Sequence, residues 1–320
     1  MVAAARLAPV TDPDATRNVR PASPAEAADP RAMHAANRAA WDEAAERYEG
    51  WFDEAVELIR GGGSNLFGVE HELLGDLRAG AGTGRAIHLQ CAGGRDTLSL
   101  WNLGAREVIG IDISPRMLAL AARLTEATGA PARWIEADVL DTPHELDGSA
   151  DLVYTGRGAL IWLHDLDGWA AVIARLLAPA GRVVIFDGHP AEWLFDADED
   201  GRLVATDYDY FGGPEASKGW APEYIDHLSI PEDDQSWKFA RAWTLGEIVT
   251  ALVGAGLHLE RLVEYPVDWW AGHRDLRPQD RGRIPLSFGL VARRARESPV
   301  GSSVRDAGRR AEPDDGSVAR

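Results

Sequence analysis

RAIHLQCAGGRDT, at residues 85–97, is followed by VIGID at residues 108–112, and these two stretches decide the fold. The first is typical of a buried strand that ends in a glycine turn and a helix start, and the second is typical of a strand that ends in an acid. Nineteen positions separate Gly93 from Asp112. This is close to the roughly 20-residue interval at which a nucleotide-type site places a carboxylate on a ribose. The two stretches therefore predict a ligand that carries a ribose.

Strands and helices alternate on both sides of these stretches. The expected strands span residues 87–90, 108–113, 133–137, 151–155, 183–186, 257–265 and 286–292. The expected helices span residues 35–48, 70–78, 96–103, 114–128, 169–177 and 245–252. Such alternation predicts the α/β class, with a Rossmann-like, mostly parallel sheet of seven strands and helices on both faces.

Three segments depart from this alternation. Residues 188–242 contain many aromatic residues but no strand–helix unit, so we expect a lid inserted after the fifth strand. Residues 1–32 and 297–320 lack hydrophobic periodicity, and we expect both to be disordered tails. The predicted domain therefore spans residues 33–296.

The composition excludes several classes of protein. The formal net charge of −18 argues against a broad contact with nucleic acid. The only cysteine, Cys91, excludes an intrachain disulfide and fits a reducing compartment. The chain has no apolar run long enough to cross a bilayer, and its first thirty residues lack the apolar core of a secretory signal. We therefore expect a soluble, cytoplasmic protein without a nucleic-acid or membrane partner, and its oligomeric state stays open.

The motifs resemble those of the class I S-adenosylmethionine-dependent methyltransferases over about residues 37–293. In that family the glycine turn holds the methionine part of the cofactor, and the acid after the second strand holds the ribose. An acid after the third strand contacts the adenine, and the fourth strand ends beside the methyl group. The resemblance implies S-adenosylmethionine as cofactor and an antiparallel last strand. One departure is Gln90, which stands where the first strand of the family often ends in an acid, so another carboxylate such as Asp96 is a candidate to help.

The resemblance also implies a set of cofactor-binding residues around the strand ends. These are Trp41, Tyr48, Gln90, Cys91, Ala92, Gly93, Gly94, Asp96, Thr97, Asp112, Ile113, Ser114, Met117, Ala137, Asp138, Val139, Thr155 and Gly156.

The chemistry of this cofactor agrees with those residue types. S-adenosylmethionine has no phosphate, and its carboxylate needs N–H groups such as those of a helix start. Asp112 is placed to accept from the ribose, and Asp138 from the adenine amino group. The sulfonium is a cation that the aromatic faces of Trp41, Tyr48 or Tyr154 can contact.

Each of these residues also has an ordinary structural interpretation. Gly93 and Gly94 fit a simple turn from a strand to a helix, and Asp138 fits an Asx turn. Cys91 is expected to be a buried filler rather than a nucleophile. Trp41 and Tyr48 lie seven positions apart and share a helix face, which core packing explains as well as cofactor contact does.

Further residues are candidates for the acceptor pocket and for a general base. The acceptor candidates are Tyr154, Arg157, Trp162, Trp193, Tyr208, Tyr210 and Trp237, whose aromatic character predicts a planar or apolar acceptor. A base, where one is needed, is predicted at His189 or His164, and His227 is also considered. A single histidine in such a place is more often a structural hydrogen-bonding residue. No metal ligands are predicted.

These interpretations predict a methyltransferase that acts on an oxygen, nitrogen or carbon nucleophile of a small molecule. The fourth strand is not followed by an Asn/Asp-Pro-Pro-Tyr segment, which in the resembled family marks methylation of planar amino groups. This absence argues against a methyltransferase that acts on amino groups of nucleic acid. Two alternatives stay open. One is a nicotinamide-dependent oxidoreductase, although the Gly-x-Gly-x-x-Gly turn usual for such enzymes is absent. The other is a catalytically silent relative that acts as a binding protein.

Overall fold

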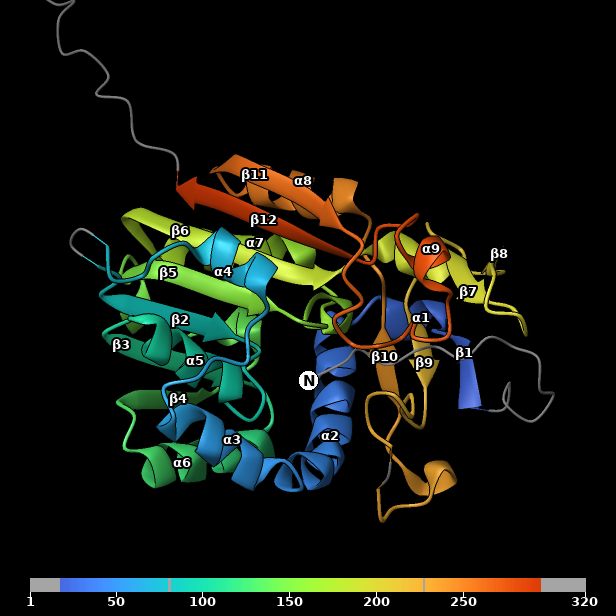
Figure 1. Ribbon diagram of the computed structural model, residues 1–320, viewed down its shortest axis with the longest axis horizontal. Coiled ribbons are helices and arrows are strands. Elements are labelled where there is room, and N and C mark those ends of the chain that lie inside the picture. Colours follow the sequence, from blue (N-terminus) through green and yellow to red (C-terminus); the bar gives the residue numbers. More distant parts are fainter. Residues whose placement is uncertain (1–17, 80–81, 227, 295–320) are drawn as a thin grey trace, which may run out of the picture.

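A seven-stranded sheet forms the centre of the computed structural model, which describes residues 18–79, 82–226 and 228–294 (Figure 1). Its strands, in spatial order, are β11 (Leu257–Tyr265), β12 (Ser287–Arg294), β6 (Leu177–Gly188), β5 (Ala150–Gly156), β2 (Arg85–Leu89), β3 (Glu107–Asp112) and β4 (Ala132–Glu136). Neighbours from β6 to β4 are parallel, and only β12 is antiparallel to both of its neighbours. The predicted fold class, including the antiparallel last strand, is confirmed.

Helices cover both faces of this sheet, so its strands are buried on both sides. Ala86 and Leu152 belong to one core cluster with residues of α3 (Phe52–Arg60), α4 (Gly68–Leu74), α5 (Arg95–Leu103) and α6 (Pro115–Thr128). Ile87 and Val153, one position further along the same strands, belong to a second cluster with α7 (Leu166–Leu176) and α8 (Leu245–Gly254). The period of two along each strand thus divides the apolar core into two layers.

Helix α6 illustrates how local sequence sets the element boundaries. The Ser114 hydroxyl accepts a hydrogen bond from the backbone N–H of Met117 at 3.1 Å, and Pro115 occupies the first turn. The helix ends at Gly129, which adopts a φ of 71°. These signals fix the start of a helix directly after β3, at the edge of the sheet where the parallel strands end.

A long helix, α2 (Pro30–Glu49), stands at this same edge (Figure 1). In Figure 1 it stands on the side of the sheet toward which the β2 arrow points, and it packs on α6. Because α2 faces the carboxyl ends of the strands, it forms a wall of any site built there.

The segment between β6 and α8 contains short strands of its own. β7 (Phe195–Ala197) and β8 (Leu203–Ala205) form a hairpin. β9 (Glu215–Ser217) and β10 (Lys238–Ala240) form a three-stranded antiparallel sheet with β1 (Val19–Pro21). In Figure 1 this small sheet lies on the far side of α2 from the central sheet. The role of the inserted segment as a lid stays a prediction.

The expected extent of the N-terminal tail needs a correction. Residues 18–32 are not disordered, because they form β1, the short α1 (Pro24–Ala27) and the start of α2. The order comes from pairing of β1 with β9, about 200 positions away in sequence, which no local pattern reveals. Residues 1–17 and the expected tail at 297–320 lie outside the described residues. A short α9 (Pro278–Arg281) precedes β12.

Within the described ranges, no helix combines the length and the apolar character needed to cross a membrane. The same ranges hold no group of three or more His, Cys, Asp or Glu side chains arranged to bind a metal ion.

Candidate functional site

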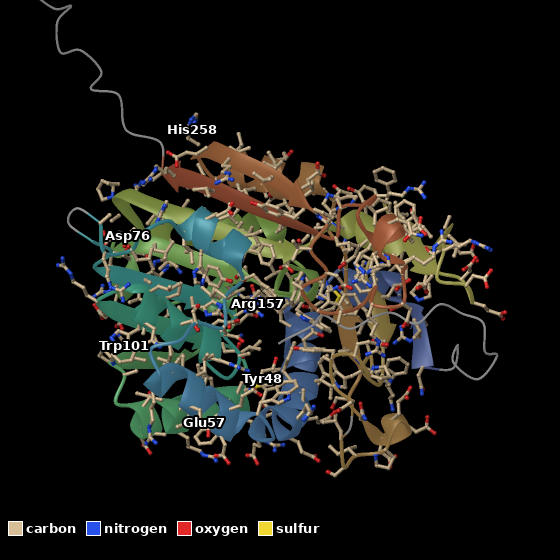
Figure 2. All side chains as sticks on the ribbon, viewed as in Figure 1. Tyr48, Glu57, Asp76, Trp101, Arg157 and His258 are labelled. Atoms are coloured by element: carbon tan, nitrogen blue, oxygen red, sulfur yellow. The ribbon has the colours of Figure 1, made fainter. Side chains whose placement is uncertain are left out.

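A cavity opens at the carboxyl ends of β2, β3 and β5, where α2 faces the sheet. It encloses about 1260 Å³ of space, including its mouth to solvent. Ligands of open α/β sheets bind at this edge. Figure 2 labels two of the lining residues, Tyr48 on α2 and Arg157 directly after β5.

The glycine turn after β2 lines this cavity with an unusual backbone. Gln90, Ala92 and Gly94 have φ angles of 58°, 45° and 80°. A left-handed conformation is unfavourable for the two residues that carry a Cβ, and such strain clusters at ligand sites. At Gly94 a side chain is also excluded by space, because a Cβ would lie 2.5 Å from the Trp134 ring and 2.8 Å from Ala121. The turn is therefore held in a shape that brings its backbone to the cavity.

Asp112, at the end of β3, holds this turn in place. One carboxylate oxygen accepts the Ala92 N–H at 2.8 Å, and the other accepts the Ser114 N–H at 2.9 Å. Burial raises the pKa of Asp112 to about 6. Each carboxylate oxygen has a second lone pair, so both can still accept a hydrogen bond from a ligand hydroxyl.

Asp138 follows β4 and lines the same cavity. Its Oδ2 accepts from Nδ1 of His34 at 2.8 Å, and its Oδ1 accepts the Leu140 N–H at 2.9 Å, as in an Asx turn. The His34 ring must carry its proton on Nδ1, because its Nε2 accepts the backbone N–H of His164. Burial alone would raise the pKa of Asp138, but the His34 hydrogen bond and the Arg31 charge outweigh it and lower the pKa. Asp138 is thus an ionised acceptor at the edge of the cavity.

Aromatic rings form the wall contributed by α2. The Trp41 ring lies 5.6 Å from that of Trp162 and 5.8 Å from that of Tyr224, both edge-on. The hydroxyl groups of Tyr48 and Tyr224 are 3.0 Å apart. All four rings line the cavity. Trp41 and Tyr48 therefore both pack against the core and line the cavity.

Most of the predicted cofactor residues lie around this one cavity. Those that line it are Trp41, Tyr48, Gln90, Cys91, Ala92, Gly93, Gly94, Asp96, Asp112, Ile113, Ala137, Asp138, Val139 and Gly156. The others, Thr97, Ser114, Met117 and Thr155, are buried and do not line it. Burial raises the pKa of the Cys91 thiol, which agrees with its expected role as a filler.

Of the predicted acceptor residues, only Arg157 and Trp162 line the cavity. Tyr154 is fully buried in β5 and donates its hydroxyl proton to Glu70. The other four belong to the inserted segment and contact other rings or cations there. Trp193 lies against Tyr208, Tyr210 against Phe211, and Trp237 beneath the guanidinium of Arg20.

The structure brings neither predicted histidine base into the cavity. Nδ1 of His189 accepts the Ala191 N–H at 3.0 Å, and its Nε2 donates to Glu264 at 2.8 Å. Nε2 of His164 lies 3.2 Å from the Phe239 carbonyl oxygen, and burial lowers the pKa of His164 to about 4. Both rings have structural partners, so the geometry gives their catalytic role no support. His227 lies outside the described residues.

Several residues that line the cavity were not predicted from the sequence. His34 and Asn37 precede Trp41 by seven and four positions on α2, and this helical spacing was a usable signal. Trp51 and Phe52 stand at the start of α3, which the expected helices omitted although Phe52, Ala55, Val56 and Ile59 have helical periodicity. Tyr224 lies in the inserted segment, where no local pattern indicates its position.

Comparisons with known proteins agree with this architecture. Residues 86–181 match the model of a family described as a methyltransferase domain. A demethylmenaquinone methyltransferase of Thermus thermophilus is 39% identical over 84 residues, which are 26% of this chain and 37% of that protein. The chain therefore spans well under half the length of that relative.

Two solved structures share the fold. An S-adenosylmethionine-dependent methyltransferase of Mesorhizobium loti has a TM-score of 0.50 and 22% identity over 71% of this chain and 96% of its own. A putative S-adenosylmethionine-dependent methyltransferase of Listeria monocytogenes has a TM-score of 0.51 and 20% identity over 70% and 95%. At such identities the likeness establishes the fold alone.

Proposed function

We propose, on the premise that this chain is a class I S-adenosylmethionine-dependent methyltransferase, that it transfers a methyl group from this cofactor to a small molecule. The premise rests on the domain match over residues 86–181, the strand order of the sheet and the sequence motifs. The proposal concerns the activity and the residues that carry it out.

One observation carries the proposal: Asp112, itself 9% exposed, lines a cavity together with the strained turn that it holds. Asp112 would accept hydrogen bonds from the ribose hydroxyls, and Asp138 from the adenine amino group. Trp41 and Tyr48 line the cavity, and their aromatic rings would contact the sulfonium cation. When bound, S-adenosylmethionine would supply the electrophilic methyl group.

The acceptor is proposed to be aromatic or apolar, because the cavity wall near Trp41 is built from indole and phenol rings. Catalysis would consist of holding an oxygen, nitrogen or carbon nucleophile in line with the methyl carbon and excluding water. Two histidines line the cavity, but both nitrogens of His34 have partners, and burial lowers the pKa of His88 to about 4. The proposal therefore includes no general base.

Titration calorimetry with S-adenosylhomocysteine and with NADH tests the cofactor. We expect heat of binding with S-adenosylhomocysteine and none with NADH. Binding of NADH alone would favour the oxidoreductase alternative, and binding of neither would refute the proposal.

A methyl-transfer assay with labelled S-adenosylmethionine then tests turnover. The acceptor panel contains phenols, amines and a quinol, the last because the Thermus relative is named for its action on demethylmenaquinone. Label in an extracted product supports the methyltransferase. Cofactor binding without labelled product across the panel favours the catalytically silent alternative.

A further inference from the structure

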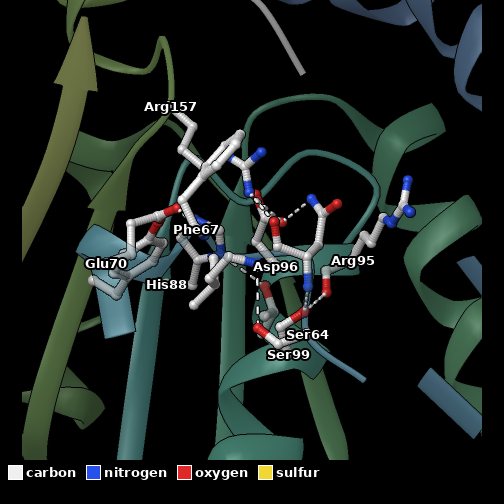
Figure 3. A network of polar contacts seen from close by, with 12 residues as sticks. Ser64, Phe67, Glu70, His88, Arg95, Asp96, Ser99 and Arg157 are labelled. Atoms are coloured by element: carbon white, nitrogen blue, oxygen red, sulfur yellow. Dashed lines mark hydrogen bonds and ion pairs between the residues drawn. The ribbon is translucent and has the colours of Figure 1, made fainter. Parts of the chain in front are cut away.

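Arg157 is a buried cation with unused hydrogen-bond donors at the cavity (Figure 3). Its side chain is 2% exposed. Nη1 donates to the Asn65 carbonyl oxygen at 2.8 Å and to a carboxylate oxygen of Asp96 at 3.2 Å. Nε and Nη2 are buried and have no hydrogen-bond partner among the described residues. Since a buried N–H without a partner is costly, these two donors indicate an acceptor that a ligand supplies.

Arg157 belongs to the wall of the cavity that follows β5, and Trp162 continues the same wall. The groups proposed for the cofactor lie on the neighbouring strands. The glycine turn of residues 90–96 follows β2, Asp112 ends β3, and Asp138 follows β4. Because the backbone N–H groups of the turn and the helix start suit the carboxylate of the cofactor, the free donors of Arg157 are left for the methyl acceptor.

The guanidinium of Arg157 keeps its charge in this setting. Burial alone would lower the pKa of Arg157, but the charges of Asp96 and Glu70 outweigh it and raise the pKa. Burial also raises the pKa of Glu70 to about 7, so this carboxylate is only partly ionised at neutral pH. The titratable groups around Arg157 are Asp96 on α5, Glu70 on α4, Tyr154 on β5, Tyr48 on α2 and His88 on β2.

A deprotonated oxygen is the partner that suits two free guanidinium donors, because charge-assisted hydrogen bonds are the strong ones. A neutral hydroxyl is a weak nucleophile, and neither His34 nor His88 at the cavity is available to remove its proton. A cation within about 4–6 Å lowers the pKa of such a hydroxyl instead. Arginine keeps its own proton, so Arg157 can stabilise an oxyanion without acting as a base.

We propose that the acceptor is an aromatic compound with an acidic hydroxyl group, and that it binds as an oxyanion on Nε and Nη2 of Arg157. The inference rests on the proposed function and narrows the nucleophile to oxygen. The hydroxyl releases its proton to solvent on binding. The oxyanion then forms a bond to the methyl carbon while the bond from that carbon to sulfur breaks, and the electron pair of the broken bond returns to sulfur.

Absorbance titration of a bound nitrophenol tests this inference, because phenolate and phenol absorb at different wavelengths. The full chain is saturated with S-adenosylhomocysteine, which has no methyl group to transfer. We expect the pKa of the bound nitrophenol to lie at least about one pH unit below its pKa in water. Arg157→Met should abolish this difference and should change the affinity for S-adenosylhomocysteine by less than about threefold. The matched control, Arg85→Met, removes an arginine at the opposite end of β2 and should keep the difference.

A neutral analogue supplies a second readout that needs no variant. Nitroanisole has the same ring as nitrophenol but cannot ionise. Well above the pKa of the free probe, nitrophenol should bind at least about tenfold more tightly than nitroanisole, because one pH unit in pKa corresponds to a factor of ten in affinity. Equal affinities would overturn the inference, whether or not Arg157→Met folds.

Other results separate the alternatives. A bound pKa equal to the value in water, or a difference that Arg157→Met retains, would overturn the inference. Loss of S-adenosylhomocysteine affinity beyond about threefold in a folded Arg157→Met variant would assign the free donors to the cofactor and would also overturn it. Failure to bind any of a series of nitrophenols of increasing ring size would exclude the phenol class and the inference with it. If the unaltered protein does not bind S-adenosylhomocysteine, the proposed function itself fails.

Discussion

Replacing Asp112 with asparagine removes one negative charge from the cavity while keeping the size of the side chain. Loss of a charged acceptor for the ribose hydroxyls should weaken S-adenosylhomocysteine by about 1.5–3 kcal/mol, or roughly 10- to 150-fold. The effect on folding is expected to be much smaller. The variant loses one of the two backbone N–H bonds that Asp112 accepts, which costs about 1–3 kcal/mol. It also escapes the cost of ionising a buried carboxyl whose pKa is about 6, which is about 1–3 kcal/mol at neutral pH.

Calorimetry with S-adenosylhomocysteine and thermal unfolding without ligand measure these two effects separately. Glu107→Gln is the matched control, because Glu107 begins the strand that Asp112 ends and its side chain is half exposed. The control should bind the nucleoside as the unaltered protein does. A folded Asp112→Asn variant whose affinity stays within threefold of the original would refute the assignment of Asp112 to the ribose.

Three further predictions concern the pH dependence of binding, the role of His189 and the packing at Gly94. The pKa of Asp112 is about 6 and its ionised form is the better acceptor, so the affinity for S-adenosylhomocysteine should fall as the pH is lowered from 7 to 5. Calorimetric titrations at several pH values measure this trend, which should be absent in Asp112→Asn. His189→Ala should lower the free energy of unfolding by about 1 kcal/mol through loss of the cap on Ala191 and the Glu264 contact, and calorimetry should find nucleoside binding unchanged; a large loss of binding would return His189 to the site. Gly94→Ala should cost about 2–4 kcal/mol in urea unfolding, since the new Cβ meets the Trp134 ring at a φ of 80°, and an unchanged midpoint would contradict this packing.

Much of the central sheet could be predicted because its signals are local. The cap at Ser114, the glycine turn and the apolar strands each lie within a few residues of the element that they define. The acid that ends β3 and the acid that follows β4 then reach one cavity because parallel strands end at a common edge.

The parts that escaped prediction depend on contacts between distant segments. β1 is three residues long and is defined by pairing with β9, so its sequence carries no periodicity. Tyr154 follows the β5 alternation, which directs it into the core toward Glu70 rather than into the cavity. His189 follows a strand, a position that favours a catalytic role, but its side chain caps the turn after β6.

A crystal structure of the full chain with S-adenosylhomocysteine tests the central claim most directly. The account predicts both ribose hydroxyls within hydrogen-bond distance of the Asp112 carboxylate, the adenine beside Asp138, and the amino-acid end at the glycine turn of residues 90–96. A nucleoside bound with its ribose away from Asp112, or bound outside this cavity, would contradict it.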